Sequence, residues 1–174
     1  MEDKTLYRIQ AVRDFGKVKS GEIGGYIESE KNLSQNGDSW IADEAMAYEN
    51  SSIRDNACLN GNAIAKGFST ICGNACLEDY AMAKDHATIC DFANLRDGCV
   101  AGDYCIIASH AVVAGKAKIR HSAYVGGFSH ITDDAVIGGL AKLDGTISVR
   151  GNAYIGGITI RLRCHDFTHG FRII

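Results

Sequence analysis

Residues 57–95 read ACLNGNAIAKGFSTICGNACLEDYAMAKDHATICDFANL, and this stretch decides the fold. A small residue recurs at every sixth position, in a series that begins at Ser39 and consists of Ala, Ser or Cys except at Ile147 and Thr159. Two positions after each small residue stands an aliphatic one, and only Arg161 breaks this second series. A period of six over this length predicts a solenoid of short repeats, because an amphipathic helix would repeat at about 3.6 residues.

A longer period of eighteen residues indicates how many sides each coil has. Like residues recur at this spacing in the aliphatic series: Ala47, Ala65, Ala83 and Ala101; Ile53, Ile71, Ile89 and Ile107; Leu59, Leu77 and Leu95. Gly or Asp stands two positions before most of the small residues, and both types suit a sharp corner with positive φ. Three hexapeptides per coil predict an all-β fold, a left-handed parallel β-helix whose triangular coils stack about 4.8 Å apart.

Composition sets the broad class of protein. The chain has 174 residues, of which 46% are hydrophobic, and this is enough for one domain with a continuous core. No apolar run approaches the roughly 18 residues of a membrane span, and the start MEDKTLYRIQ lacks the apolar run of a signal peptide. We therefore expect a cytoplasmic protein with no membrane partner. A net charge of −3 without a basic stripe argues against direct nucleic-acid binding.

Seven cysteines are present, and in a reducing compartment we expect them to be small apolar fillers or inert thiols. Two pairs stand eighteen residues apart, Cys58 with Cys76 and Cys72 with Cys90, so the members of each pair would meet on adjacent coils. The redox state of both pairs stays open at this point.

The pattern aliphatic-x-x-x-small-x over about residues 39–160 resembles the hexapeptide-repeat superfamily. Residues 6–37, LYRIQAVRDFGKVKSGEIGGYIESEKNLSQNG, resemble the N-terminal block of small bacterial and phage members usually labelled only as transferases. We expect an N-terminal cap over 1–37 that leads into the first coil, the β-helix over 38–160, and a C-terminal cap over 161–174. The first cap would cover the open end of the helix with apolar residues, namely Leu6, Ile9, Val12, Phe15, Val18, Ile23, Tyr26, Ile27 and Leu33.

Many hexapeptide proteins are acyltransferases that use acetyl-CoA or another acyl-CoA, and this resemblance supplies the alternative function. It implies a His general base beside a subunit interface, often a long loop that interrupts the coils, and a C-terminal helix. The register from Ser39 to Ile155 contains no insertion, and no helical pattern follows it. His110, flanked by Phe92 and Phe128 at eighteen-residue spacing, is the candidate base under the enzyme hypothesis.

Carbonic anhydrases of the same superfamily form a second resemblance, which implies three His ligands on a metal shared between subunits. The repeat places His86, His110, His121 and His130 on different corners and faces, so they do not converge within one chain. The tail offers Cys164, His165, Asp166 and His169 without a second group of ligands, and whether it holds a metal stays open. We predict no catalytic residue, no metal and no cofactor.

Outward positions offer a first candidate interface. One face carries apolar residues at eighteen-residue spacing, interrupted by Lys118 and flanked by Lys66, Lys84 and Arg120; we call this set the stripe, and it consists of Met46, Ile64, Met82, Val100, Val136 and Tyr154. Outward apolar residues in a line indicate a protein interface, and Met suits adaptable packing. We predict that the stripe mediates self-association into a dimer or a trimer.

Two corner ladders offer a second surface, for a partner other than the protein itself. Phe68, His86 and Tyr104 would stack along one edge, and Phe92, His110 and Phe128 along another, both beside the acidic residues Asp85, Asp91 and Asp103. Aromatic and acidic edges suit protein recognition, although stacked rings also stabilise neighbouring corners.

These observations favour a non-catalytic, oligomeric solenoid that binds proteins. Its resemblance to the phage branch implies a phage or prophage protein that binds a host protein, and an inhibitor of a CRISPR or other defence component fits that class. A CoA-dependent acyltransferase is the alternative.

Overall fold

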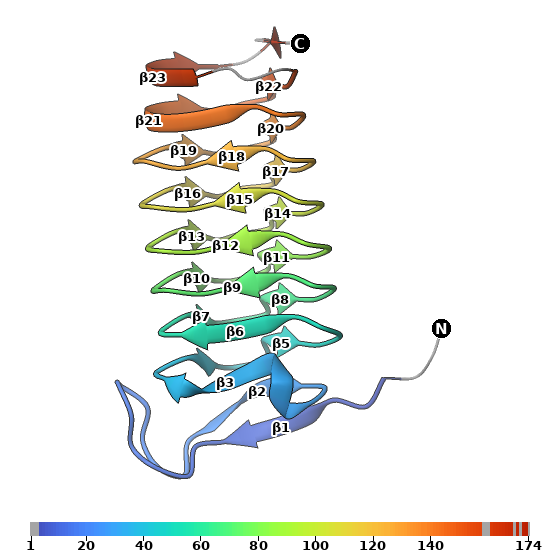
Figure 1. The fold of residues 1–174 in the computed structure, drawn as a ribbon, viewed down its shortest axis with the longest axis vertical. Helices are drawn as coiled ribbons and strands as arrows, with labels where there is room; N and C mark the ends of the chain where they lie inside the picture. Colours follow the sequence, from blue (N-terminus) through green and yellow to red (C-terminus); the bar gives the residue numbers. More distant parts are fainter. Residues whose placement is uncertain (1–3, 158–160, 169, 171, 174) are drawn as a thin grey trace.

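The computed structural model describes residues 4–157, 161–168, 170 and 172–173, and the side chains of 161–165 lie outside this description. The chain forms a stack of triangular coils, and each full coil contributes one short strand to each of three faces (Figure 1). We name these faces A, B and C in the order in which the chain crosses them. One short 3-10 helix, η1 (Glu30–Asn32), precedes the regular coils.

Face A is a sheet of ten strands, which are β1 (Tyr7–Gln10), β2 (Ile23–Ile27), β5 (Met46–Ala47), β8 (Ile64–Ala65), β11 (Met82–Ala83), β14 (Val100–Ala101), β17 (Lys118–Ile119), β20 (Val136–Ile137), β22 (Tyr154–Ile155) and β24 (Arg172–Ile173). Face B consists of β3 (Leu33–Gly37), β6 (Ser52–Asp55), β9 (Thr70–Ile71), β12 (Thr88–Ile89), β15 (Ile106–Ile107), β18 (Tyr124–Val125) and the first half of β21 (Lys142–Val149). Face C consists of β4 (Trp40–Ile41), β7 (Cys58–Leu59), β10 (Cys76–Leu77), β13 (Asn94–Leu95), β16 (Val112–Val113), β19 (His130–Ile131) and the second half of β21, and β23 (Arg161–Phe167) pairs with β21.

The coil is left-handed. In Figure 1, the face B strands β9 and β12 run from right to left on the near side, and face C follows behind them while the chain climbs from its N-terminal end. Paired residues on successive coils are eighteen apart, as in Ile71 with Ile89 and Leu77 with Leu95. The predicted fold class, a left-handed parallel β-helix with eighteen-residue coils, is confirmed.

The core is a set of stacked columns inside the prism. Ile53, Ile71, Ile89 and Ile107 form one column with no exposed surface, and the alanines Ala47, Ala65, Ala83 and Ala101 form another. Small residues such as Ala57 and Ala63 are also fully buried, because they stand where the chain turns inward after each corner. The six-residue period therefore reflects one corner and one inward-facing strand residue per repeat.

The corners depend on a left-handed backbone conformation. Asp91 has φ 60° and Gly67 has φ 70°, and the same conformation recurs on almost every edge. The Asp91 carboxylate accepts a hydrogen bond of 2.9 Å from the backbone N–H of Ser109, the corner residue of the next coil. Asp and Gly occupy these corners because both tolerate positive φ, and Asp also ties its coil to the following one.

The ladder begins further toward the N-terminus than the hexapeptide repeat alone predicts. Tyr26 pairs with Met46 and Leu33 pairs with Ile53, a separation of twenty residues in both cases. The two additional residues lie within β3, between Leu33 and Gly37, because Gly37 pairs with Asp55 at the regular separation of eighteen. Before β3, the buried side chain of Asn32 in η1 donates a hydrogen bond of 2.9 Å to the backbone O of Ser51. Two of the apolar residues expected to cover the open end, Val12 and Ile23, are instead exposed.

The corner between faces B and C is open at β21, and β23 on the next coil also runs through it as one strand. Ile147 occupies a position that elsewhere holds a small residue, and its side chain is buried. β21 consequently runs through the corner between faces B and C as one continuous strand, and Gly145 has φ 133° instead of the value near 65° seen at the neighbouring glycine corners. An isoleucine is too large for a tight corner, so the backbone extends around it.

Within the described residues, no helix has the length and apolar character needed to cross a membrane.

Candidate protein-binding surfaces

The stripe lies on face A as predicted from the spacing. In-register pairing joins Met46 to Ile64, Ile64 to Met82, and Met82 to Val100, and the same ladder continues through Lys118 to Val136 and Tyr154. All six stripe residues are half-buried by their neighbours on the prism. Arg172 extends the column, with its guanidinium carbon 5.4 Å from the centre of the Tyr154 ring.

Face A is also basic. Around Val100 the surface forms a depression of about 260 Å³, whose charged lining consists of Lys84, Asp103, Lys118 and Arg120. Lys84 donates a hydrogen bond of 2.8 Å to Asp85, and this bond raises the pKa of Lys84 and lowers the pKa of Asp85. The stripe is therefore an apolar column bordered by cations, and such a surface suits an acidic partner.

The first predicted aromatic ladder is present at the edge between faces A and B. The ring centres of Phe68 and His86 are 4.9 Å apart, those of His86 and Tyr104 are 4.7 Å apart, and the rings are parallel within 5°. Phe68 is 57% exposed and Tyr104 is 64% exposed. Three large rings thus form a continuous exposed stack along this edge.

The second ladder lies at the edge between faces B and C. His110 stacks between Phe92 and Phe128, with ring centres 5.0 Å and 4.9 Å away. Both phenylalanine rings are more than half exposed. His110, the candidate general base of the enzyme hypothesis, is therefore enclosed on both ring faces by phenyl groups and exposed along its edge.

The three acidic residues assigned to partner binding act within the solenoid itself. The carboxylates of Asp85, Asp91 and Asp103 accept hydrogen bonds from the backbone N–H groups of Asp103, Ser109 and His121, at 3.2, 2.9 and 2.8 Å. Each bond joins a corner to the corner of the next coil. These carboxylates have a structural role, and each retains acceptor sites beyond this bond.

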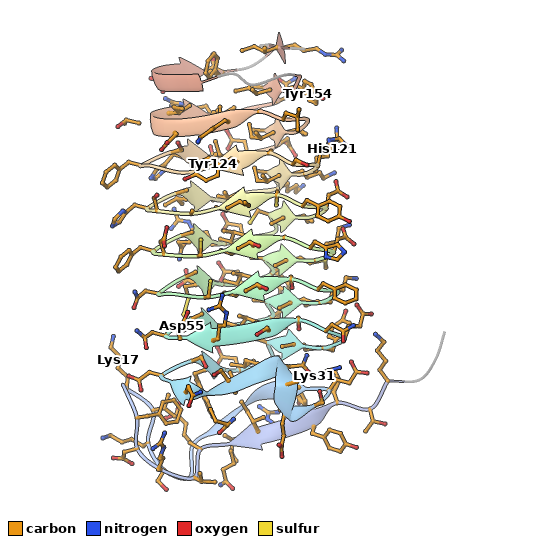
Figure 2. The ribbon with its side chains drawn as sticks, in the orientation of Figure 1. Lys17, Lys31, Asp55, His121, Tyr124 and Tyr154 are labelled. Carbon is orange, nitrogen blue, oxygen red and sulfur yellow. A yellow bond between two sulfur atoms is a disulfide. The ribbon has the colours of Figure 1, made fainter. Side chains whose placement is uncertain are left out.

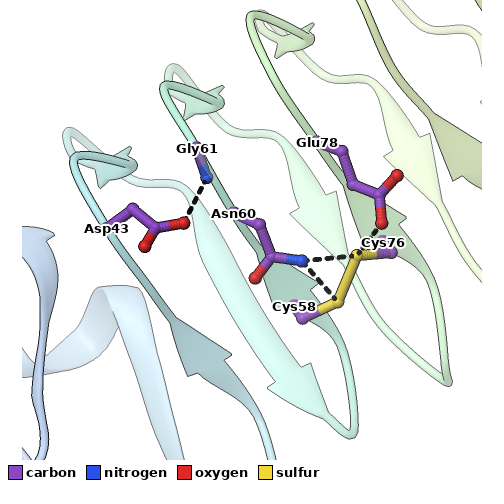
Figure 3. Close-up of a disulfide and its surroundings, with 6 residues drawn as sticks. All are labelled: Asp43, Cys58, Asn60, Gly61, Cys76 and Glu78. Atoms are coloured by element: carbon purple, nitrogen blue, oxygen red, sulfur yellow. Dashed lines mark hydrogen bonds between the residues drawn. A yellow bond between two sulfur atoms is a disulfide. The ribbon is translucent and has the colours of Figure 1, made fainter.

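A disulfide joins Cys58 and Cys76 on face C, where β7 and β10 pair in register (Figure 3). The expectation of inert thiols is thus wrong for this pair. The reason is geometric, because adjacent strands hold the two Cα atoms 4.8 Å apart, within the range that a disulfide spans. Asn60 donates a hydrogen bond of 3.3 Å to the Sγ of Cys76.

Cys72, Cys90, Cys99 and Cys105 are free thiols. Burial raises the pKa of Cys90 to about 11 and those of Cys99 and Cys105 to about 12. These groups stay protonated at neutral pH, and a protonated thiol is a weak nucleophile and a poor metal ligand. For Cys72 and Cys90 the expectation of inert thiols agrees with this environment.

Among the described residues, no group of three or more His, Cys, Asp or Glu side chains could hold a metal ion. His121 has a structural role in the solenoid, because its Nδ1 accepts a hydrogen bond of 3.1 Å from the backbone N–H of Gly139 on the next coil. The candidate ligands Cys164, His165 and His169 lie outside the described side chains.

The open corner at Ile147 borders a groove of about 750 Å³ that the repeat pattern did not predict. Its lining combines rings, hydroxyl groups and charges, namely Phe128, His130, Thr132, Thr146, Ile147, Ser148, Arg150 and Asp166. The groove lies directly beside the Phe128 end of the second ladder, so it enlarges that edge as a surface for contact. The signal that could have predicted it is the replacement of a small residue by Ile147.

An eighteen-residue coil made of three hexapeptides, with a small buried residue after each corner and a stacked aliphatic core, is the fold of the hexapeptide-repeat superfamily. No family model matches the chain. A similar protein is the uncharacterized acetyltransferase YdcK of Escherichia coli (strain K12), which is 36% identical over 63 residues. The match covers 36% of this chain and 19% of that relative, so the chain corresponds to a small part of the relative's length.

Proposed function

We propose that this protein is a non-catalytic, oligomeric β-solenoid that acts by binding proteins. The observation that carries the proposal is the pair of exposed aromatic ladders, because solvent-exposed rings stacked along two edges form a rigid apolar surface. Aromatic side chains are enriched in protein interfaces, where they contribute large contact areas at low cost in conformational entropy. The stripe on face A, with its border of Lys and Arg, is a further surface of this kind and suits an acidic partner.

The partner that follows from the sequence resemblance is a host protein, such as a component of a CRISPR or other defence system, bound by a phage or prophage protein. The two ladders support binding to a protein of any origin. The identity of the host factor rests only on the sequence resemblance to phage proteins and stays a prediction.

The second candidate is a CoA-dependent acyltransferase, and the similarity to YdcK favours it. Such an enzyme needs a base that reaches the acceptor group, and His110 is the residue for that role. Both ring faces of His110 are covered by Phe92 and Phe128, which leaves only its edge for chemistry. Between residues 39 and 157 the described chain consists of short strands and corners, without an inserted loop that could close over an acyl-CoA.

Removal of the first ladder tests the binding function. We expect that the double variant Phe68→Ala/Tyr104→Ala loses the protein partners that the wild-type protein retains from a lysate of its native host, because two exposed rings leave the interface. Truncation of an interface hot spot weakens binding by about 2 kcal/mol or more, and aromatic residues are enriched among hot spots. The measurement is affinity capture followed by quantitative mass spectrometry.

Tyr80→Ala is the matched control. Tyr80 is 69% exposed on the third edge, which carries no ring ladder, so its removal deletes a similar area elsewhere on the prism. The control is expected to retain the same partners as the wild type. Equal retention by the wild type, the control and the double variant would exclude the ladder as the binding surface.

A further inference from the structure

Face B, which lies between the two aromatic ladders, is free of charge over its four central strands. Every outward residue of these strands and of the positions that follow them is uncharged: Thr70, Cys72, Thr88, Cys90, Ile106, Ala108, Tyr124 and Gly126. Charges border this area at its ends, with Arg54 on β6 and with Lys142 and Asp144 on β21, and along its two edges at the corner carboxylates of Asp85, Asp91 and Asp103. Figure 2 shows Tyr124 lying on this near face, with His121 at the edge to its right.

The central area is neutral at physiological pH and partly apolar. Ile106 is 41% exposed, although it stands on a strand of the prism. Burial raises the pKa of Cys90 to about 11, and burial followed by the nearby Asp144 raises the pKa of Tyr124, so both groups stay uncharged. A neutral sheet face with an exposed Ile, framed by two rows of exposed rings, is a surface that water solvates poorly.

Face A, in contrast to face B, is charged. Two copies that met through the stripe would bring Lys66, Lys84, Lys118 and Arg120 of one copy toward the same cations of the other. Like charges at an interface cost several kcal/mol. Face B is therefore the better candidate for contact between identical chains.

We propose, on the basis of the proposed binding function, that face B binds face B of a second copy in an antiparallel dimer. The two-fold axis lies in the plane of the contact, across the prism, between the strands β12 and β15. This symmetry sets each strand of face B opposite the strand at the same distance on the other side of the axis. β6 thus faces β21 of the second copy, β9 faces β18, and β12 faces β15.

The charges at the two ends become complementary in this arrangement. Arg54 follows the outward residue of β6 by two positions, and Asp144 follows the outward residue of β21 by two positions, so both lie in the same column of face B. The two-fold axis places Arg54 of each copy opposite Asp144 of the other, at both ends of the interface. Both side chains are exposed: half of the Arg54 side chain is open to solvent, and its guanidinium lies 3.4 Å from the carboxylate of Asp55 in its own chain.

The rings and the central side chains are also matched. The axis sets His86 opposite Tyr104 on one edge and Phe92 opposite His110 on the other. It also sets the corner carboxylate of Asp85 opposite that of Asp103, where each accepts a hydrogen bond from the backbone N–H of the next coil. In the centre, Thr88 faces Ile106, and the bulky Tyr124 faces the smaller Thr70. A parallel arrangement would instead place equal strands opposite each other, with Arg54 beside Arg54, and it would lose the complementary charges.

The area of face B is sufficient for a dissociable dimer. From β6 to β21 the face is about 24 Å long at the ~4.8 Å strand spacing, and about 20 Å wide at ~3.3 Å for each of six residues. The footprint of about 480 Å² per copy gives a total near 1,000 Å², which is about the minimum for a specific interface. Side-chain relief and the rings at both edges increase the contact surface beyond this flat value.

A charge exchange tests the proposal. Sedimentation velocity of the full chain between about 1 and 100 μM is expected to show a monomer–dimer equilibrium, the behaviour of an interface of this size. Arg54→Asp alone and Asp144→Arg alone should each raise the dissociation constant at least about tenfold, because each sets like charges opposite each other at both ends. The double variant Arg54→Asp/Asp144→Arg should return to within about threefold of the wild type, since the pairs are restored with reversed sign.

A matched pair of variants distinguishes the two faces. Ile106→Asp on β15 places a charge in the centre of face B and should yield a monomer, whereas Val100→Asp on β14 of the same coil places one in the stripe and should leave the dimer intact. Circular dichroism melting of each variant shows that the solenoid remains folded. A wild type that stays monomeric, a double variant without rescue, or loss of the dimer in Val100→Asp instead of Ile106→Asp would overturn the proposal. Because the ladder rings border this contact, partner capture is also measured with Ile106→Asp, which removes the dimer and keeps all six rings. Retained capture by this variant, whatever its oligomeric state, distinguishes failure of the dimer from failure of the binding function.

Discussion

Gly127→Ala is expected to lower the free energy of unfolding by about 3 kcal/mol or more. Gly127 has φ +64°, and a Cβ atom there would lie 2.4 Å from the backbone N and 2.5 Å from the backbone O of Gly145 on the next coil. Backbone atoms cannot rotate away, so the two coils would have to separate. Urea denaturation followed by circular dichroism measures the loss.

Gly61→Ala is the control for this prediction. Gly61 has nearly the same backbone conformation, φ +66°, but its Cβ would lie 3.1 Å from the nearest atoms of Asp79. Aspartates occupy equivalent corners elsewhere, so a Cβ is tolerated where the coils leave this space. We expect a loss of about 1 kcal/mol for Gly61→Ala. Equal losses for the two variants would contradict the closer approach of the coils at Gly127.

Ile89→Ala is expected to cost about 2–5 kcal/mol, the range for truncation of a fully buried aliphatic side chain. Ile89 has no exposed surface and pairs with Ile71 below and Ile107 above in the central column of the core. A prism of stacked coils has little freedom to collapse around the cavity, because neighbouring coils are held in register by backbone hydrogen bonds. The free energy of unfolding from urea titration checks the value.

Thr88→Ala provides the comparison on the same strand. Thr88 points outward and is half-buried, so its truncation removes little core contact. We expect a change below about 1 kcal/mol. A larger loss for Thr88→Ala than for Ile89→Ala would mean that the inward and outward positions are exchanged, which the register of β12 excludes.

The regular coils could be predicted from the sequence because a solenoid converts its repeat directly into contacts. Residues eighteen apart become neighbours on adjacent coils. The spacing therefore predicts that Met82 contacts Val100 and that Phe92 contacts His110, as the structure shows. The same arithmetic brought Cys58 to Cys76, but spacing alone does not determine whether two adjacent thiols oxidise.

The ends and the open corner could not be predicted in the same way. The first coil contains twenty residues between paired positions, and the two additional residues within β3, between Leu33 and Gly37, interrupt the fixed period there. Ile147 was visible as an exception in the series of small residues, but its consequence, a strand that runs through a corner, depends on how the backbone accommodates the larger side chain. The carboxylate of Asp91 was expected at a binding edge, and the hydrogen bond that it accepts from the backbone N–H of Ser109 on the next coil could not be predicted from the spacing.

Face B gave no periodic signal. Its outward columns mix Thr, Cys, Ile, Ala, Tyr and Gly. Apolar residues at constant spacing therefore indicate the stripe on face A and do not indicate face B. Its neutrality, its exposed Ile106 and its position between two ring ladders become apparent only when the three faces are placed around the coil.

Titration calorimetry of the wild-type protein with acetyl-CoA tests the central claim, that the prism surface serves protein binding and not acyl transfer. A hexapeptide acyltransferase must bind its acyl-CoA, whereas a binding module with this surface has no such requirement. We predict no saturable heat of binding, with the wild type and with the variant His110→Ala alike. A one-site isotherm with the wild type that disappears with His110→Ala would contradict the account and assign the protein to the acyltransferases.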